Sequence, residues 1–230
     1  MFQRVFLTAI VAGLCAGLAL FAAQRVKIYP LIERAEVYEV QAAAAHHHDH
    51  GAPAAEIEEW EPAPGLERAA YSLLADLVAG VGFALLLIGA AALAEARGHA
   101  IDAHRGLWWG AAGFAVFALA PSLGLAPELP GMEAAALAQR QEWWLATALA
   151  TACGLGLIVF WQSWVYRVAG IVALALPHLA GAPQHSGEGG SVPPELAAEF
   201  VVASLATAAL FWLVLGGLGG WLYRRLSPSP

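Results

Sequence analysis

Residues 71–93 read YSLLADLVAGVGFALLLIGAAAL and contain one charged side chain, Asp76. A helix needs about 20 consecutive and mostly apolar residues to cross the hydrocarbon core of a bilayer. Every backbone polar group in lipid must be satisfied internally, and a helix does this within a single segment. The stretch therefore predicts a membrane-spanning α-helix.

The composition of the whole chain agrees with this interpretation. Hydrophobic residues make up 60% of the 230 residues, charged residues make up 13%, and the mean hydropathy is +0.63. A soluble domain of this size carries about a quarter charged residues. The net charge of −7 argues against nucleic-acid binding, which needs a basic face.

Six apolar segments predict an all-α, polytopic integral membrane helical bundle that forms one domain over residues 1–230. The segments are 5–24, 71–93, 107–125, 143–161, 168–180 and 196–222. A signal peptide is the competing interpretation of the first segment, but that run is long and lacks a clean small-x-small cleavage site. The fifth segment is short and contains Pro177, so we expect a tilted or broken helix, or a re-entrant segment.

The charge distribution predicts a cytoplasmic N-terminus in a multi-pass protein of the cytoplasmic (inner) membrane. The short inner segments then carry six arginines against two acids: Arg4, Arg97, Arg105, Arg167, Arg224 and Arg225 against Glu95 and Asp102. Short loops are where the positive-inside bias is read. Six spans also return the Arg224-Arg225 pair to the inside, whereas five spans would leave it outside.

A metal-ligand motif occupies the polar stretch between the first two spans, residues 30–68, which we expect to be an outer loop. The motif reads His46-His47-His48-Asp49-His50. Neutral imidazole is a leading ligand for divalent transition metals, and carboxylate is a hard co-ligand. The cluster predicts handling of a metal cation. Adventitious affinity in a flexible loop is the alternative, because His-rich tracts are a compositional signal.

Other groups able to bind a cation fall on the same predicted outer side. Glu36 and Glu39 precede the His motif, and His185 lies in the last outer loop. Further carboxylates on this side are Glu33, Glu56, Glu58, Glu59, Glu61, Glu188, Glu195 and Glu199. A negative mouth that carries histidines concentrates cations and raises their capture rate.

Asp76 and His178 are candidate metal ligands within predicted spans, where an ionisable side chain is costly and usually faces a polar interior. Asp76 is shallow enough for the alternative of a carboxylate that reaches the interface. His178 follows Pro177, and broken helices commonly line a binding cavity in membrane proteins. The alternative is a neutral histidine hydrogen-bonded to a neighbouring helix.

Four more ionisable residues crowd the short inner loop between the second and third spans. They are Glu95, His99, Asp102 and His104. They offer either a low-affinity exit site for the cation or an ordinary solvated loop.

Several strings in order along the chain resemble CbtA, a family of predicted cobalt transporter subunits. They are Met1-Phe2-Gln3-Arg4, Ala35-Glu36-Val37-Tyr38-Glu39, the His motif with Glu58-Glu59-Trp60, residues 110–125 leading into Pro127-Glu128-Leu129-Pro130-Gly131, Pro177-His178-Leu179 with Gly181-Ala182-Pro183, and Gly220-Trp221-Leu222-Tyr223-Arg224-Arg225. The resemblance implies a cobalt permease linked to cobalamin metabolism, with a small one-span partner that carries its own His-rich motif. The resemblance also implies that the His motif, Glu36, Glu39 and His178 belong to the candidate metal site.

These observations predict a metal-uptake permease that captures cobalt in the outer His-rich segment and passes it between lipid-facing helices, alone or as a homo-oligomer. The chain has no P-loop, and no metalloprotease or nucleophile-elbow motif that would indicate an enzyme. A non-transporting subunit that delivers metal to a partner is the main alternative. A membrane-anchored cytochrome would need a second axial histidine besides His178.

Overall fold

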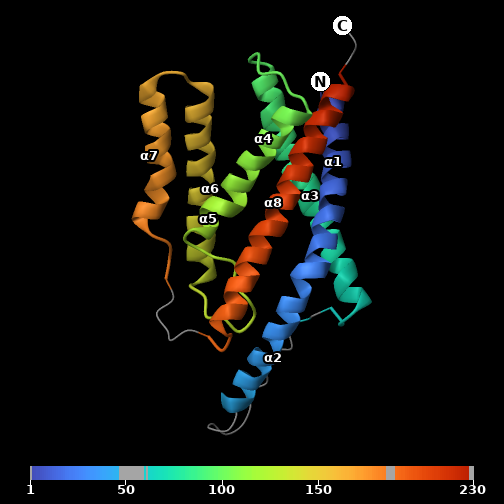
Figure 1. Cartoon of the computed structure of the whole chain (residues 1–230), viewed down its shortest axis with the longest axis vertical. Coiled ribbons are helices and arrows are strands. Elements are labelled where there is room, and N and C mark those ends of the chain that lie inside the picture. Colours follow the sequence, from blue (N-terminus) through green and yellow to red (C-terminus); the bar gives the residue numbers. More distant parts are fainter. Residues whose placement is uncertain (1, 47–59, 61, 185–189, 228–230) are drawn as a thin grey trace.

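The computed structural model describes residues 2–46, 60, 62–184 and 190–227 (Figure 1). All regular secondary structure in these residues is helical. The elements are α1 (Phe2–Lys27), α2 (Tyr29–His46), α3 (Leu66–Glu95), α4 (Ala103–Phe114), the π-helix η1 (Ala115–Leu119), α5 (Ala120–Ser122), α6 (Leu137–Phe160), α7 (Trp164–Ala180) and α8 (Pro194–Arg225).

Among the described residues, four helices are long and apolar enough to cross a membrane: α1, α3, α6 and α8. The third predicted span is helical without a gap from Ala103 to Ser122, although its middle turn is a π-helix. The fifth predicted segment, α7, is a shorter apolar helix of 17 residues. The expected all-α, polytopic membrane bundle is therefore confirmed.

Two local expectations differ from the structure. Of the forms expected for the fifth segment, the broken helix is not seen: α7 is continuous, and Pro177 lies in its last turn, where only three residues follow the lost backbone hydrogen bond. The predicted outer loop is helical as far as His46, since α2 continues almost directly from α1. The backbone amide of Ile28, between the two helices, still donates to Gln24.

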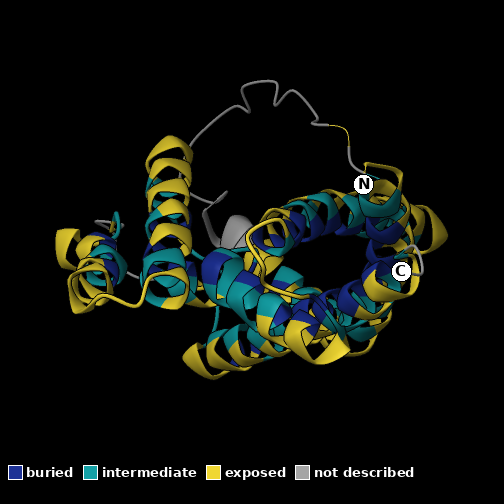
Figure 2. Cartoon of the chain, turned by 90° about the horizontal axis from the view of Figure 1, so that it is seen from above, coloured by how far each residue is buried: buried dark blue, intermediate teal, exposed yellow. Residues whose placement is uncertain are grey.

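The long segments alternate in direction, so both chain termini lie at one end of the bundle (Figure 1). We call this the termini end, and we call the opposite end, where α2 lies, the α2 end. Helix α1 packs against α3 and α8, and α4 packs against α8, whereas α7 packs against α6 to one side. Seen from above, buried residues face the inside of the group of helices and exposed residues face outward (Figure 2).

Glycines allow three pairs of helices to bring their backbones into contact. A Cβ built on Gly13 of α1 would lie 2.6 Å from the Cα of Val81 in α3. A Cβ on Gly216 of α8 would lie 2.6 Å from the Cα of Gly110 in α4. The α6–α7 pair meets in the same way at Gly154 and Gly170. Lipid gives apolar helices no hydrophobic drive to associate, so close packing of small residues provides much of the attraction.

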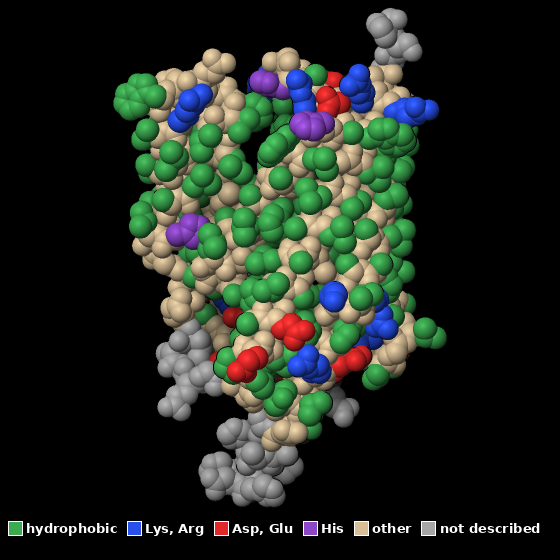
Figure 3. Space-filling view, in the orientation of Figure 1, with side chains coloured by type: hydrophobic (Ala, Val, Ile, Leu, Met, Phe, Trp, Pro, Cys, Tyr) green, Lys and Arg blue, Asp and Glu red, His purple; other side chains and the backbone are tan. Residues whose placement is uncertain are grey.

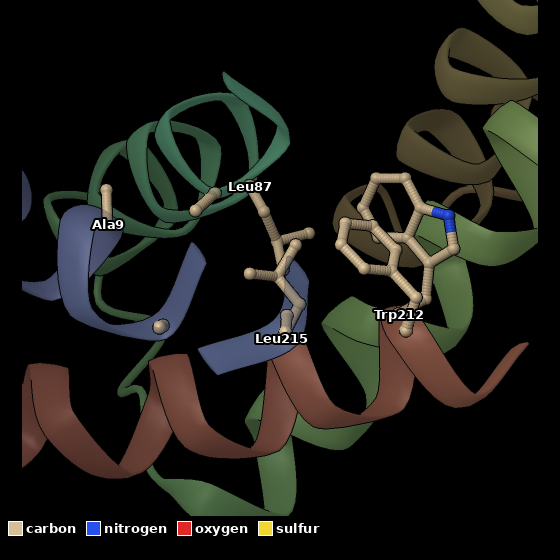
Figure 4. Packing of buried hydrophobic residues seen from close by; sticks show 8 residues of the cluster. Ala9, Leu87, Trp212 and Leu215 are labelled. Atoms are coloured by element: carbon tan, nitrogen blue, oxygen red, sulfur yellow. The ribbon is translucent and has the colours of Figure 1, made fainter. Parts of the chain in front are cut away.

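Larger side chains fill the centre between α1, α3 and α8. Leu87 and Leu215 point toward one another there, with Ala9 on the α1 side and Trp212 at the opposite edge (Figure 4). The π-helix places Phe117 flat against Trp212, with the ring centroids 5.4 Å apart. Buried apolar side chains therefore fill this part of the bundle.

A polar cluster joins α1, α3 and α8 at the termini end. The Arg4 guanidinium contacts both carboxylate oxygens of Glu95 at 3.3 and 3.4 Å, and its Nε donates to the Tyr223 carbonyl at 2.7 Å. The buried Tyr223 hydroxyl donates to Glu95 at 2.8 Å. Charge-assisted hydrogen bonds of this kind are the stronger ones in proteins, so the cluster fixes the ends of three helices.

We expect Gly80→Ala to destabilise the protein by about 1–3 kcal/mol, because the new methyl group overlaps the Gly13 backbone of α1. Gly82→Ala, two residues along the same helix, is the matched control, since a Cβ there meets nothing within 4 Å. Thermal unfolding in detergent measures both. Equal melting temperatures for the two variants would contradict the backbone-contact account of this crossing.

Candidate functional site

The candidate capture site belongs to the α2 end of the bundle, but the structure describes only part of it. Glu36 and Glu39 lie on α2, and the backbone of His46 is the last residue of that helix. His47, His48, Asp49, His50 and His185 lie outside the described residues. Of these groups, the structure therefore places Glu36, Glu39 and the backbone of His46.

Helix α2 is anchored to the rest of the α2 end by an apolar cluster. Its Leu31 and Ala35 are buried with Leu129 of the α5–α6 connection and with Leu196 and Phe200 of α8. This packing explains why a segment with several charged side chains is held in place beyond the end of α1. Glu39 of α2 is exposed, and its backbone lies beside the Gly131 turn, where a Cβ on Gly131 would be 3.3 Å from the Glu39 Cβ.

Two ion pairs tie this anchored helix to α3 and α8, and a third lies elsewhere at the same end. Arg68 Nη2 contacts Glu36 Oε1 at 2.7 Å, which joins α3 to α2. Arg34 of α2 contacts Glu199 of α8 at 3.3 Å. Arg140 of α6 contacts Glu128 within the same end. Glu36 is therefore held by a cation, and it must exchange Arg68 for the metal if it is a ligand.

Asp76 lies in α3 beside the glycine contact with α1. A Cβ on Gly17 would lie 2.6 Å from the Asp76 carbonyl oxygen, so the two backbones touch at this level. The carboxylate atom Oδ2 is buried and has no hydrogen-bond partner among the described residues. A buried oxygen without a partner is costly, so a bound cation or proton at this carboxyl group would offset the cost.

His178 lies in the last turn of α7 and is half-buried against α6. Its ring meets the Trp143 ring edge-on with centroids 5.9 Å apart, and the Trp143 indole donates to the Pro177 carbonyl at 3.3 Å. Helix α7 packs on α6, whereas α3 packs on α1 and α8, so the structure does not bring His178 and Asp76 together. Within the described ranges, no three His, Cys, Asp or Glu side chains form a group that could hold a metal.

Three of the four ionisable residues in the predicted inner loop have structural partners. Glu95 belongs to the cluster with Arg4 and Tyr223, and the His99 ring lies 5.1 Å from the Phe160 ring. Asp102 caps α4 by accepting the Arg105 amide, and this hydrogen bond is the main reason that the pKa of the Asp102 carboxyl is lowered. These contacts favour a structural role over an exit site. The position of Asp102 directly before α4 is the sequence feature that indicates an N-cap.

The sequence analysis missed a groove of about 650 Å³ between η1, α5, α6 and α8. Its lining is mostly apolar and includes Phe117, Pro121 and Trp144, with Arg140 as its charged member. Arg140 Nε is buried and has no hydrogen-bond partner in the described part of the chain. Pro121, which lies inside an apolar run, is the sequence feature that could have indicated this groove. Proline and π-turns often mark irregular points in a span.

Comparison with known proteins identifies a family. A family model described as "Probable cobalt transporter subunit (CbtA)" matches residues 2–224. No curated protein and no solved structure matches the chain. The match covers α1 to α8 and therefore both ends of the bundle.

We expect Arg68→Gln to tighten binding of Co²⁺ by about fivefold, because it removes a cation held 2.7 Å from Glu36. Isothermal titration of the detergent-solubilised protein measures this change. Arg34→Gln is the matched control, since it releases Glu199, which is outside the candidate ligand set. If both variants bind Co²⁺ equally more tightly, the effect comes from the loss of one positive charge anywhere at this end, and Glu36 is not a ligand.

Proposed function

We propose that this chain, which belongs to the family of probable cobalt transporter subunits (CbtA), is the subunit that carries divalent cobalt through the membrane. Family membership over residues 2–224 is the observation that carries the proposal. The helical bundle, with at least four helices long enough to cross a membrane, supports a multi-pass transport protein.

The charge distribution supports an orientation with the termini end in the cytoplasm and the whole protein in the cytoplasmic (inner) membrane. Helices α3 and α4 are joined at this end by a short connection that carries Arg97, and Arg105 follows in the first turn of α4. Charged side chains gather at the two ends of the molecule, and the middle band is largely hydrophobic (Figure 3). A short connection with basic residues is typical of a cytoplasmic loop.

We place cobalt capture at the α2 end, which then faces outward. Helix α2 delivers the His46–His50 motif at its C-terminal end and carries Glu36 and Glu39 along its length. Its apolar anchor holds α2 at this end of the bundle, and α8 begins at the same end, after the connection in which His185 occurs in the sequence. Imidazole and carboxylate together suit a divalent first-row metal, and their summed charge raises the local cation concentration.

Asp76 is the next candidate ligand for the cation after the capture site. Its carboxylate lies inside the span α3, and its buried Oδ2 has no hydrogen-bond partner among the described residues. His178 lies on α7, which packs on α6 and not on α3. It would therefore contact the cation at a separate place, on the α2 side of the α6–α7 pair. Ligand type alone does not select cobalt, because nickel and copper bind most nitrogen and oxygen sites more tightly. Selectivity then depends on site geometry, metal supply or another subunit.

The word subunit in the family description indicates an assembly. A small one-span, His-rich partner and a second copy of this chain are the partners that we propose for it. One observation favours the alternative of a metal-delivery subunit without transport. The described helices hold no group of three metal-ligating side chains, so a pore site within this chain alone has little support.

Replacement of His46, His47, His48 and His50 by Ala is expected to raise the Co²⁺ concentration for half-maximal uptake about tenfold or more, with little change in maximal uptake. Removal of imidazoles from an outer collector weakens capture but leaves the route intact. Uptake of radioactive cobalt by whole cells measures this. His99→Ala with His104→Ala at the termini end is the matched control. Complete loss of uptake would show that the motif is part of the translocation site.

Binding of Co²⁺ is expected to weaken at least tenfold between pH 7.5 and pH 5.5. Imidazole has a pKa of about 6.5 in model compounds, and its protonated form cannot ligate a metal. Isothermal titration of the solubilised protein at the two pH values tests this. The same affinity at both would remove the histidines from capture.

Reconstitution of the purified chain into vesicles separates the two functions. A permease is expected to give Co²⁺ influx that a metal-quenched dye inside the vesicles records. The variant with His46, His47, His48 and His50 replaced by Ala shows how much influx falls when only capture is weakened. Tight Co²⁺ binding without influx, restored only when a second subunit is added, would identify a delivery subunit.

A further inference from the structure

A second hollow lies at the termini end, between the start of α4 and the end of α8. It has a volume of about 640 Å³ and is lined by Asp102, Ala103, His104, Trp221, Arg224 and Arg225. Figure 3 shows basic, acidic and histidine side chains gathered at this end of the molecule. The proposed capture of cobalt at the α2 end does not use this hollow.

Arg224 and Arg225 differ from the arginines that hold the fold together. Arg4, Arg34, Arg68 and Arg140 each contact a carboxylate within 4.0 Å. Neither Arg224 nor Arg225 makes such a contact in the described part of the chain, and both are exposed. Two guanidinium groups therefore face the hollow with hydrogen-bond donors available.

Asp102 is the acidic group that faces the same hollow. Its carboxylate is committed to the α4 N-terminus, where it accepts the Arg105 amide at 2.9 Å. The lowered pKa of this carboxyl keeps it charged at neutral pH, so it offsets one of the two arginine charges. The two arginines and the single carboxylate therefore leave the hollow with a net positive charge.

We propose that this hollow binds the phosphate of an acidic phospholipid from the leaflet at the termini end. Guanidinium groups bind phosphate oxygens in a bidentate manner, and basic pockets between membrane helices on the cytoplasmic side bind acidic headgroups. The hollow is therefore complementary to a lipid phosphate in charge and in donor geometry.

The surroundings of the hollow favour a lipid over a free phosphate ion. Trp221 has its ring at the rim, and the Arg225 guanidinium lies over it at 5.8 Å from the ring centroid. Tryptophan is enriched at the membrane–water interface, so this pair places the charge at headgroup level. Exposed Leu107 and Trp108 of α4 continue as apolar surface for the acyl chains. The bound lipid would bridge α4 and α8 where Arg4, Glu95 and Tyr223 already join α1, α3 and α8.

Native mass spectrometry of the full chain, titrated with phosphatidylglycerol or phosphatidylcholine of the same acyl chains, tests the proposal. We expect phosphatidylglycerol to bind roughly 30-fold more tightly, since each basic residue beside an anionic headgroup contributes about fivefold. Arg224→Gln with Arg225→Gln removes this preference. Arg224→Lys with Arg225→Lys keeps most of it. Arg167→Gln, an exposed arginine of α7 at the same end, leaves it unchanged.

The competing outcomes are distinct. Equal affinity of the intact chain for the two lipids, or an equal loss of preference in Arg167→Gln, would overturn the proposal. Displacement of phosphatidylglycerol by millimolar inorganic phosphate would also overturn it, because it would show a site for the free anion. If the double glutamine variant does not fold, Arg225→Gln alone is expected to weaken phosphatidylglycerol about fivefold. Cobalt binding is not part of this readout, so the result is independent of the proposed transport function.

Discussion

Contact between helix backbones at glycine is the constraint on which the rest of this bundle depends. In lipid, helices gain little from burying apolar side chains, so close approach and continuous van der Waals contact must hold them together. Gly13 with Gly80, Gly110 with Gly216, and Gly154 with Gly170 provide that approach in three separate pairs. The positions of the polar groups at both ends follow from these three crossings.

The crossings divide the molecule into a tightly packed group and a less constrained pair. Helices α1, α3, α4 and α8 enclose the apolar centre, and Arg4, Glu95 and Tyr223 join α1, α3 and α8 at the termini end. Helices α6 and α7 stand to one side and reach the group mainly through η1 and α5 (Figure 1). Asp76 belongs to the first unit and His178 to the second, so a route that used both would require the two units to move or a further subunit to lie between them.

The sequence predicted the helices well and the site only in part. Apolar runs such as residues 71–93 predict spans because lipid leaves a helix few alternatives, and the structure has an apolar helix there. We did not expect a helix in the polar run after the first span, and in the structure α2 is held by burial of Leu31 and Ala35 against distant parts of the chain. The break expected at Pro177 failed because the effect of proline depends on its distance from the helix end.

By itself the sequence determined the class of protein, the segments that enter the membrane and the supply of metal-ligating groups. These properties follow from composition and local periodicity, which are fixed along the chain. Only the tertiary structure decided that Glu36 is paired with Arg68, that Asp76 keeps a buried oxygen without a described partner, and that Arg224 and Arg225 share a hollow with Asp102. Each of these depends on contacts between residues far apart in sequence, and helix crossings set those distances.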